Sequence, residues 1–291
     1  MSQVEGAVLS YAQNSEDVLL SRVLKDTSGI YVDVGACHPI IDSVTYAFYE
    51  RGWTGINLEP TRAMFERLQS VRPRDINLNT AISSEDGHET FYECRKHLPL
   101  STMNPTVAAE IRQSGGVLEE RPIEVKTLAT VLTEQNISRI DFLKVDVEGH
   151  EKEVLSGNDW GKFRPTVLVI ESTHPRSTIG EYQLWEQIIL KAGYVFAVFD
   201  GLNRYYVKQE ESGLVEELSR PLSVFDEYVP FRQFAQIRFL RDAVARTLED
   251  SEPVTGENLK TLLDAMVDDP MLCQKSPAFL GQTLKDIIAK S

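Results

Sequence analysis

The chain has 291 residues and a formal net charge of −14, from 44 acidic and 30 basic side chains. Its hydrophobic content of 42% and charged content of 25% are those of a folded globular protein that is long enough to bury a sizeable core. The acidic balance and the lack of a dense Lys/Arg cluster disfavour a nucleic acid partner, because its phosphates would be repelled.

The first 25 residues carry five charged side chains and no long apolar run, which is not typical of a signal peptide. No stretch reaches the roughly 18 apolar residues of a transmembrane segment. The three cysteines, Cys37, Cys94 and Cys273, form no CxxC pair, so they predict reduced thiols rather than a disulfide framework or a zinc site. We therefore expect a protein that acts in the cytoplasm.

Residues 30–60 predict one strand, helix and strand with parallel strands. An apolar run over 30–34 contains Asp33 and leads into Gly35-Ala36, and a second run over 55–58 ends at Glu59, 26 positions after Asp33. Ligands of such units bind at the carboxyl ends of the strands, where small residues let them approach the backbone. A carboxylate at the end of the second strand can accept hydrogen bonds from both ribose hydroxyls.

The full three-glycine dinucleotide fingerprint is missing, since His38 and Pro39 stand where further glycines are expected. A nucleoside ligand without a pyrophosphate therefore fits better than NAD. The alternative is an ordinary βαβ unit that binds no ligand.

The next segments predict a helix over 62–71, a strand with its exit loop over 76–83, and a short strand over 89–93. Residues 95–122 contain no regular pattern that we can assign. Because a long irregular connection inside a compact domain is either functional or mobile, we interpret this segment as a candidate lid over a site.

Acidic side chains end the later core strands as well. The predicted strand over 142–145 is followed by Asp146, and the buried run over 165–170 is followed by Glu171. Together with Asp33 and Glu59 these carboxylates end successive strands, so we expect them along one edge of the sheet. This clustering is the main physical reason to predict a site there.

The last part of the chain predicts two different structures. Residues 194–207 predict an antiparallel hairpin around Asp200-Gly201. Beyond about residue 230, apolar residues at helical spacing predict a helical appendage. We expect a domain over 1–229 and an extension over 230–291 that packs on the domain or makes a homo-oligomer through its helices.

Several motifs together resemble the FkbM family of S-adenosylmethionine-dependent O-methyltransferases, over roughly residues 11–207. The motifs are Tyr11-x-Gln13-Asn14-x-Glu16-Asp17, Asp33-Val34-Gly35-Ala36, Gly52-Trp53-x-Gly55-x-Asn57-x-Glu59-Pro60, Asn79-x-Ala81-Ile82-Ser83 and Lys144-Val145-Asp146-Val147-Glu148-Gly149-His150-Glu151. The resemblance implies a class I, Rossmann-like α/β fold with a mostly parallel sheet and a C-terminal antiparallel hairpin.

The resemblance also implies a set of cofactor-binding residues. Those expected to contact S-adenosylmethionine are Gln13 and Asp17 closing the pocket, Asp33, Gly35 and Ala36 at the methionine part, Glu59 and Pro60 at the ribose, Thr80, Ala81 and Ile82 at the adenine, and Asp146. The chain departs from the family where Cys37-His38-Pro39 replaces the Asn and Gly of many relatives.

Methyl transfer to a hydroxyl requires an aligned acceptor and removal of its proton. The candidates near the strand ends are Asp146, Glu148, His150, Glu171 and His174. We predict Asp146 nearest the acceptor, and His174 or His150 as general base; the alternative for each histidine is a hydrogen-bonded loop residue. For Glu148 we favour a carboxylate at a helix N-terminus.

A divalent cation such as Mg²⁺ is a candidate cofactor, held by Asp146, Glu171 and a further oxygen ligand, since hard cations prefer carboxylates. The expected acceptor is a sugar hydroxyl, on a nucleotide sugar or at the end of a glycan, and the alternative is a polyketide-type natural product. Two other classes are a nicotinamide oxidoreductase, which the missing glycines disfavour, and a scaffold without catalysis, which the intact motifs disfavour.

Overall fold

The computed structural model describes residues 8–235. The chain divides into two compact units, Met1–Tyr228 and Val229–Ser291, and the fold described below is that of the first unit. The predicted helical extension over 230–291, and with it the predicted oligomer through its helices, falls almost wholly outside the described residues.

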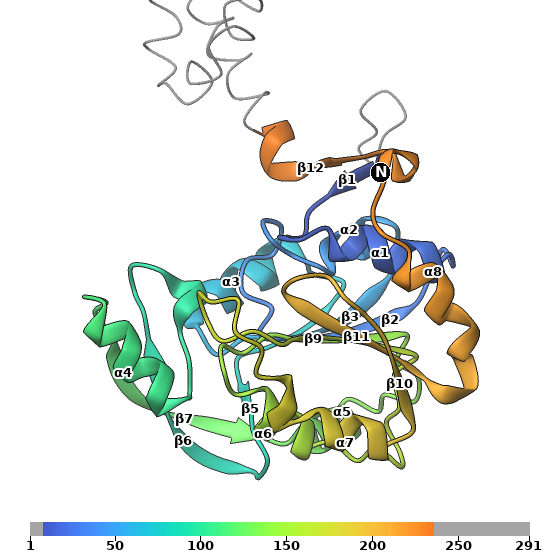
Figure 1. Cartoon of the computed structure of the whole chain (residues 1–291). Helices are drawn as coiled ribbons and strands as arrows, with labels where there is room; N and C mark the ends of the chain where they lie inside the picture. The colour runs from blue at the N-terminus through green and yellow to red at the C-terminus, as the bar shows by residue number, and fades with distance from the viewer. Residues whose placement is uncertain (1–7, 236–291) are drawn as a thin grey trace, which may run out of the picture. The chain divides into compact units, whose positions relative to one another are not determined.

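A seven-stranded sheet forms the centre of the first unit (Figure 1). In spatial order its strands are β10 (Tyr194–Phe199), β11 (Asn203–Lys208), β9 (Val167–Glu171), β8 (Phe142–Val145), β2 (Ile30–Val34), β3 (Thr54–Leu58) and β4 (Ile76–Leu78). The five strands from β9 to β4 run parallel, while β11 pairs antiparallel with both β9 and β10. The predicted mostly parallel α/β sheet, ending in an antiparallel hairpin, is confirmed.

The direction in which the chain adds strands reverses between β2 and β8. The chain first adds β3 and β4 on one side of β2, and then β8 and β9 on the other side. The chain that leaves β2 therefore runs toward β3, and the chain that leaves β8 runs in the opposite direction toward β9. Open parallel sheets bind their ligands at such a point.

Helices cover both faces of the sheet (Figure 1). They are α1 (Glu16–Val23), α2 (Tyr46–Glu50), α3 (Arg62–Val71), α5 (Leu128–Glu134), α6 (Glu151–Ser156), α7 (Glu186–Lys191) and α8 (Val215–Ser219). Side chains alternate along each strand. Tyr31 of β2 therefore belongs to an apolar cluster with residues of α1, α2 and α8, whereas its neighbour Val32 belongs to a cluster with residues of α5, α6 and α7. Each face thus has its own apolar core.

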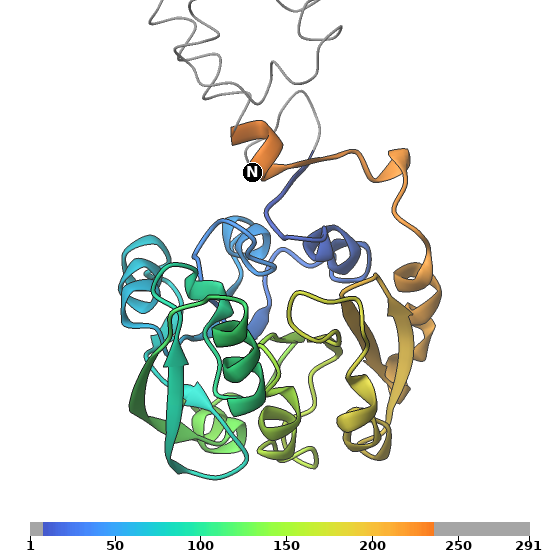
Figure 2. The same ribbon diagram turned by 60° about the vertical axis from the view of Figure 1, so that its left-hand side comes forward.

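A smaller lobe lies beside the main sheet (Figure 2). It consists of a three-stranded sheet, β5 (Ala81–Ile82), β7 (Glu119–Lys126) and β6 (Gly87–Glu93), together with α4 (Pro105–Gln113). The segment 76–83, predicted as a strand and its exit loop, contains the strand β4, and the predicted exit loop includes β5, because Ala81 and Ile82 pair with β7.

The prediction of an irregular connection over 95–122 is also wrong for its centre, which is helix α4. The side chain of Asn104 accepts hydrogen bonds from the backbone N–H groups of Thr106 and Val107, and Pro105 occupies the first turn. Asn at the N-cap followed by Pro is a standard helix start. The buried face of α4 is short, with Val107, Ala108 and Ile111, which leaves little periodicity to recognise.

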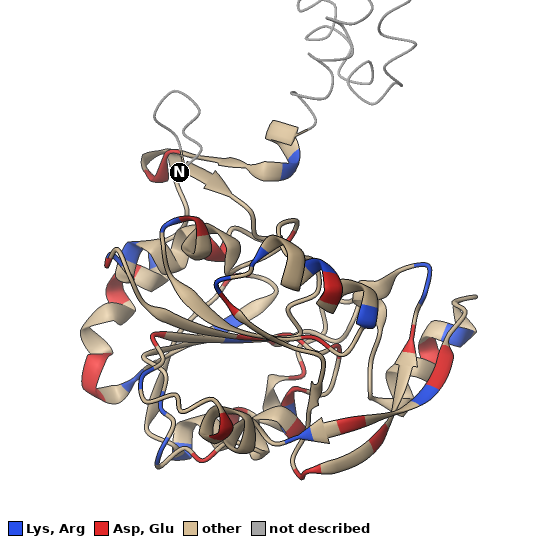
Figure 3. Cartoon of the chain, turned by 180° about the vertical axis from the view of Figure 1, so that it is seen from behind, with Lys and Arg blue, Asp and Glu red and all other residues tan. Residues whose placement is uncertain are grey.

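The remaining short elements are β1 (Val8–Ser10), β12 (Tyr228–Pro230), η1 (Leu98–Leu100), η2 (Tyr182–Leu184), η3 (Gln209–Leu214) and η4 (Val224–Asp226). Acidic and basic side chains are interspersed over the first unit (Figure 3). Among residues 8–235 there is no helix with the length and apolar character needed to cross a membrane.

Candidate active site

The loops after β2 and β8 are in direct backbone contact. The N–H of Asp146 donates to the carbonyl of Val34 at 3.1 Å. Gly35 has a φ of +81°, and a Cβ atom there would lie 1.9 Å from the carbonyl oxygen of Asp146. Only glycine fits this position, because the backbone needs both the left-handed conformation and the space.

Glu59 connects the end of β3 to the β2 loop. Its Oε2 accepts from the N–H of Cys37 at 2.8 Å and its Oε1 from the N–H of Thr61 at 2.6 Å. Burial raises the pKa of this carboxyl, which is only 5% exposed. Each oxygen has a second lone pair, so Glu59 can hold the loop and still accept from a ligand hydroxyl.

The departure from the family pattern at Cys37-His38-Pro39 has a local structural role. Nδ1 of His38 accepts from the N–H groups of Ile40 at 3.1 Å and Ile41 at 2.9 Å. Partial burial lowers the pKa of His38, which favours the neutral imidazole that can accept. His38 therefore supports the turn from within, as Asn or Asp side chains do elsewhere.

Lys144 is the buried cation of the site. Its Nζ donates to the carbonyl of Gly35 at 3.1 Å and lies 3.5 Å from Oδ1 of Asp33 and 3.3 Å from Oδ2 of Asp146. Burial opposes its charge, but the two carboxylates raise the pKa of Lys144, so it stays protonated. The sequence did not reveal which groups Lys144 contacts. A lysine inside a buried strand nevertheless indicates that a charged partner lies near it.

Asp33 lies between Lys144 and a buried polar network. It is buried, and its Oδ2 accepts from the Thr45 hydroxyl at 2.8 Å. The same hydroxyl accepts from Arg72, a fully buried guanidinium that also pairs with Asp75 at 2.9 Å. This network fixes the end of β2, and in it Oδ2 of Asp33 accepts from the Thr45 hydroxyl.

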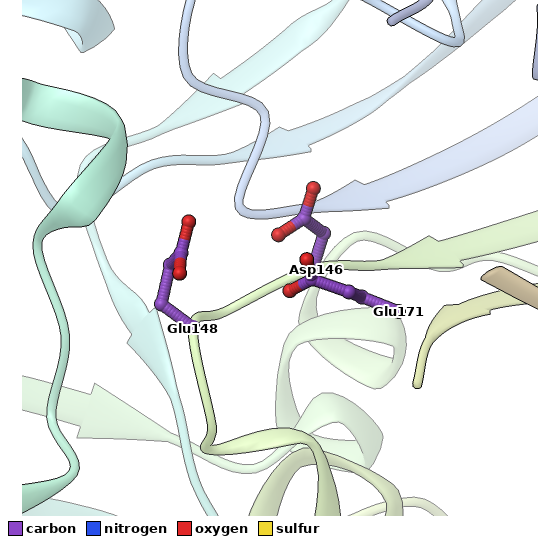
Figure 4. Close-up of side chains that lie close together, drawn as sticks. All are labelled: Asp146, Glu148 and Glu171. Carbon is purple, nitrogen blue, oxygen red and sulfur yellow. The ribbon is translucent and has the colours of Figure 1, made fainter. Parts of the chain in front are cut away.

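Three carboxylates gather where β8 and β9 end (Figure 4). Asp146 follows β8, Glu148 lies two residues further on, and Glu171 ends β9. Each side chain offers an oxygen within 4.8 Å of the others. The predicted pair Asp146 and Glu171 is thus brought together, and Glu148 joins it.

Burial and mutual repulsion both raise the pKa of acids in this cluster. Burial and then the charge of Asp146 raise the pKa of Glu148 to about 9, and the same two causes raise that of Glu171 well above its usual range. Carboxyl groups this close cannot all be ionised at neutral pH without a positive charge among them. The cluster therefore holds protons or binds a cation.

We predicted that Glu148 is a carboxylate at a helix N-terminus. In the structure Glu151, the first residue of α6, has that position. Glu148 has a φ of +54° and Gly149 one of +90°, so two left-handed residues precede His150 and the start of α6. Oε1 of Glu151 accepts from the N–H groups of Val147 at 3.1 Å and Gly149 at 3.2 Å. Two successive left-handed residues cannot be inferred from local propensity, so the sequence alone did not reveal this turn.

The smaller lobe holds the same loop from outside. The Thr102 hydroxyl donates to the carbonyl of Glu148 at 2.7 Å, and the Asn104 side chain donates to the carbonyl of Gly149 at 2.7 Å. Both residues belong to the segment predicted as a lid. The segment lies against the candidate site, and closure over a ligand stays a prediction.

The two candidate histidines make their contacts elsewhere. His150 is buried, its Nε2 lies 3.2 Å from the Ser83 hydroxyl, and burial lowers its pKa. Nε2 of His174 lies 2.5 Å from Glu110, and its Nδ1 lies 2.9 Å from Glu181. Although burial opposes protonation, these carboxylates raise the pKa of His174. The structure groups neither ring with Asp146, so the role of general base stays a prediction.

The N-terminal motif supports the fold around the site. Asp17 is buried and accepts from the Ser10 hydroxyl at 2.6 Å and the N–H of Tyr11 at 2.7 Å, while Gln13 is exposed. Burial raises the pKa of Asp17 to about 6. Glu16 accepts from Nδ2 of Asn203 at 2.8 Å.

The residues predicted beside the adenine are mostly core. Ala81 and Ile82 are buried, whereas Thr80 is half-buried at their edge. The carbonyls of Glu59 and Pro60 both accept from Nδ2 of Asn79, at 2.8 and 3.0 Å. Of the three residues predicted beside the adenine, Thr80 is the one that is not fully buried.

The comparison with protein families agrees with this arrangement. The family model for the Methyltransferase FkbM domain matches residues 33–196, which is more than half of the chain. The matched range includes Gly35, Glu59, Asp146 and Glu171. A search of curated proteins found no match. The chain belongs to the FkbM methyltransferase family.

Proposed function

We propose that the protein is an S-adenosylmethionine-dependent O-methyltransferase of the class I, Rossmann-like fold, and that its acceptor is a sugar hydroxyl. The observation that carries the proposal is that two sets of residues lie close together at the point where the strand order reverses. One group is the tight Gly35 loop with Glu59, and the other is the acidic cluster after β8 and β9. Ligands of open parallel sheets bind at this point.

The residues on the β2 and β3 side fit a nucleoside cofactor. Glu59 has lone pairs for the ribose hydroxyls, and Ala36 keeps the loop narrow beside it. In this proposal Asp33 and Gly35 define the methionine end, Pro60 and Thr80 to Ile82 border the adenine, and Gln13 and Asp17 close the pocket. When bound, the cofactor supplies a methyl group on a positively charged sulfur, which makes the thioether a good leaving group.

The residues on the β8 and β9 side fit the acceptor. Carboxylates accept hydrogen bonds from several hydroxyls at once, and a sugar presents several. Lys144 holds the Asp146 carboxylate at 3.3 Å, so that its other oxygen can face an acceptor hydroxyl and take up its proton. Glu171 lies beside it, and His150 and His174 remain the alternative bases.

The test is methyl transfer from labelled S-adenosylmethionine to three groups of hydroxyl compounds: UDP-hexoses, methyl hexopyranosides and a hydroxylated macrolide. The proposal predicts labelled product with a sugar, and saponification-resistant label would identify an ether rather than an ester. Product from the macrolide alone would support the polyketide alternative. Cofactor binding without transfer to any hydroxyl or other nucleophile would support a scaffold.

A further inference from the structure

We infer that Asp146, Glu148 and Glu171 form a binding site for a divalent cation of the Mg²⁺ or Mn²⁺ class. One carboxylate oxygen of each residue lies within 4.8 Å of those of the other two, and the three side chains border one common space (Figure 4). A cation at the centre of such a set can contact one oxygen of each residue after small rotations of the side chains.

An unpartnered oxygen of Glu171 supports the site independently of the clustering. Glu171 is only 9% exposed, and within residues 8–235 its Oε2 has no hydrogen-bond partner. A buried carboxylate oxygen without a donor is costly, and most such oxygens in folded proteins are satisfied. A cation beside Asp146 would satisfy it.

The charges around the cluster favour the same conclusion. Lys144 is the cation that forms an ion pair with Asp146, but it is shared with Asp33 at 3.5 Å. Glu148 and Glu171 form no ion pair with a basic side chain among the described residues, and the neighbouring Glu151 adds a further acid. The cluster therefore has more negative charge than its own basic residue can balance.

The donor atoms indicate which kind of cation fits. All three ligands are carboxylate oxygens, which suit hard cations such as Mg²⁺ and Mn²⁺, whereas Zn²⁺ prefers nitrogen and sulfur donors. The backbone also holds the ligands in place. Glu171 ends a central strand, and the turn that carries Glu148 is held by Glu151 and Thr102.

The inference extends the proposed function but does not depend on it, because cation binding requires neither the cofactor nor the acceptor. If the proposed function is right, the cation lies next to Asp146, where the acceptor hydroxyl is expected. There it would lower the pKa of that hydroxyl and supply the positive charge that the cluster lacks.

The experiment is calorimetric titration of MgCl₂ and MnCl₂ into the full chain, after treatment with EDTA and in the absence of S-adenosylmethionine. We expect saturable binding of one cation with a Kd below about 1 mM. Glu171→Gln keeps the shape of the side chain and should weaken binding at least tenfold. The matched control, Glu85→Gln, removes an exposed acid from a turn and should leave the Kd unchanged.

Thermal unfolding of the same proteins separates loss of the site from loss of the fold. Without a cation, Glu171→Gln should unfold at the same temperature as wild type or higher, since it relieves repulsion. With 5 to 10 mM MgCl₂, as a rough excess over the expected Kd, wild type and Glu85→Gln should gain stability and Glu171→Gln should not.

The inference is overturned if wild type binds neither cation in this range, which would mean that the acids share protons instead. It is also overturned if Glu171→Gln binds as tightly as wild type. Cation binding without binding of S-adenosylmethionine would contradict the proposed function alone, and binding of S-adenosylmethionine in EDTA without cation binding would contradict this inference alone.

Discussion

The ammonium of Lys144 lies 3.3 Å from Oδ2 of Asp146, and this pair connects the buried end of β2 to the acidic cluster beyond β8. Lys144 also lies 3.5 Å from Oδ1 of Asp33, its buried register partner on β2. One cation therefore sets the position of the residue that we place nearest to the acceptor.

Lys144→Met tests this connection, because it keeps the length of the side chain and removes the charge. We expect the free energy of unfolding to fall by about 3 kcal/mol, since Asp33 would be left as a buried charge without its partner. Urea unfolding measures the change. The double variant Lys144→Met/Asp33→Asn should recover part of the lost free energy of unfolding. A free energy of unfolding for Lys144→Met within about 0.5 kcal/mol of wild type, the size expected for a surface substitution, would contradict this account.

Gly35→Ala tests the contact between the loops after β2 and β8. The added Cβ would meet the Asp146 carbonyl at 1.9 Å, in addition to the strain of a φ of +81°. The matched control is Gly115→Ala, which has a similar φ of +87° and no neighbour within 4 Å of the new Cβ.

We expect Gly115→Ala to cost about 1 kcal/mol of stability, and Gly35→Ala to cost clearly more and to abolish cofactor binding. Chemical unfolding and calorimetry measure the two effects. Equal costs for the two variants would mean that the β8 loop moves aside easily.

Much of this architecture could be predicted from local patterns. Apolar runs that end in Asp33, Glu59, Asp146 and Glu171 are enough to predict parallel strands with acids at one edge, and the sheet has that form. The hairpin around Asp200-Gly201 has a recognisable turn. These features depend on neighbours in the sequence, which is why they could be inferred without a structure.

The features that could not be predicted depend on long-range contacts or on unusual backbone angles. Ala81 leaves β4 because β7, more than 35 residues further along the chain, offers it a partner. Glu148 joins Asp146 and Glu171 only because two left-handed residues turn the loop. Lys144 gains its role from Asp33, which lies on a different strand.

The buried Glu16 predicts a pH dependence of stability. Burial is the largest cause that raises the pKa of Glu16, and repulsion from Asp200 raises it further. Backbone hydrogen bonds lower it in part, and the result is a rise from 4.5 to about 7. The folded state therefore binds this proton more tightly than the unfolded state. Its contribution to stability is fully present below pH 4.5 and is lost as the pH rises to about 7.

Glu16→Gln removes this titration and can still accept from Asn203. We expect the variant to gain stability relative to wild type between pH 5 and pH 8, by on the order of 2 kcal/mol. Urea unfolding at the two pH values gives the difference. A difference between the two proteins that does not change with pH would show that Glu16 has an ordinary pKa.

Asp146 and the two histidines can be compared in one series of variants. Asp146→Asn should lower kcat at least a hundredfold and leave the Kd for the cofactor within about tenfold, because we place it on the acceptor side. His150→Gln and His174→Gln should lower kcat less than tenfold, since their rings contact Ser83, Glu110 and Glu181 instead of the cluster. A hundredfold loss in either histidine variant would identify that ring as the general base.

The most direct test of the proposed function is calorimetric titration of the full chain with S-adenosylmethionine and S-adenosylhomocysteine, with wild type and Glu59→Gln. The amide keeps one acceptor for the loop but loses the carboxylate that we assign to the ribose. We predict saturable binding to wild type and a Kd at least tenfold weaker for Glu59→Gln, with EDTA present or absent. Failure of wild type to bind either compound would contradict the methyltransferase proposal, and equal binding by both proteins would contradict the placement of the ribose at Glu59.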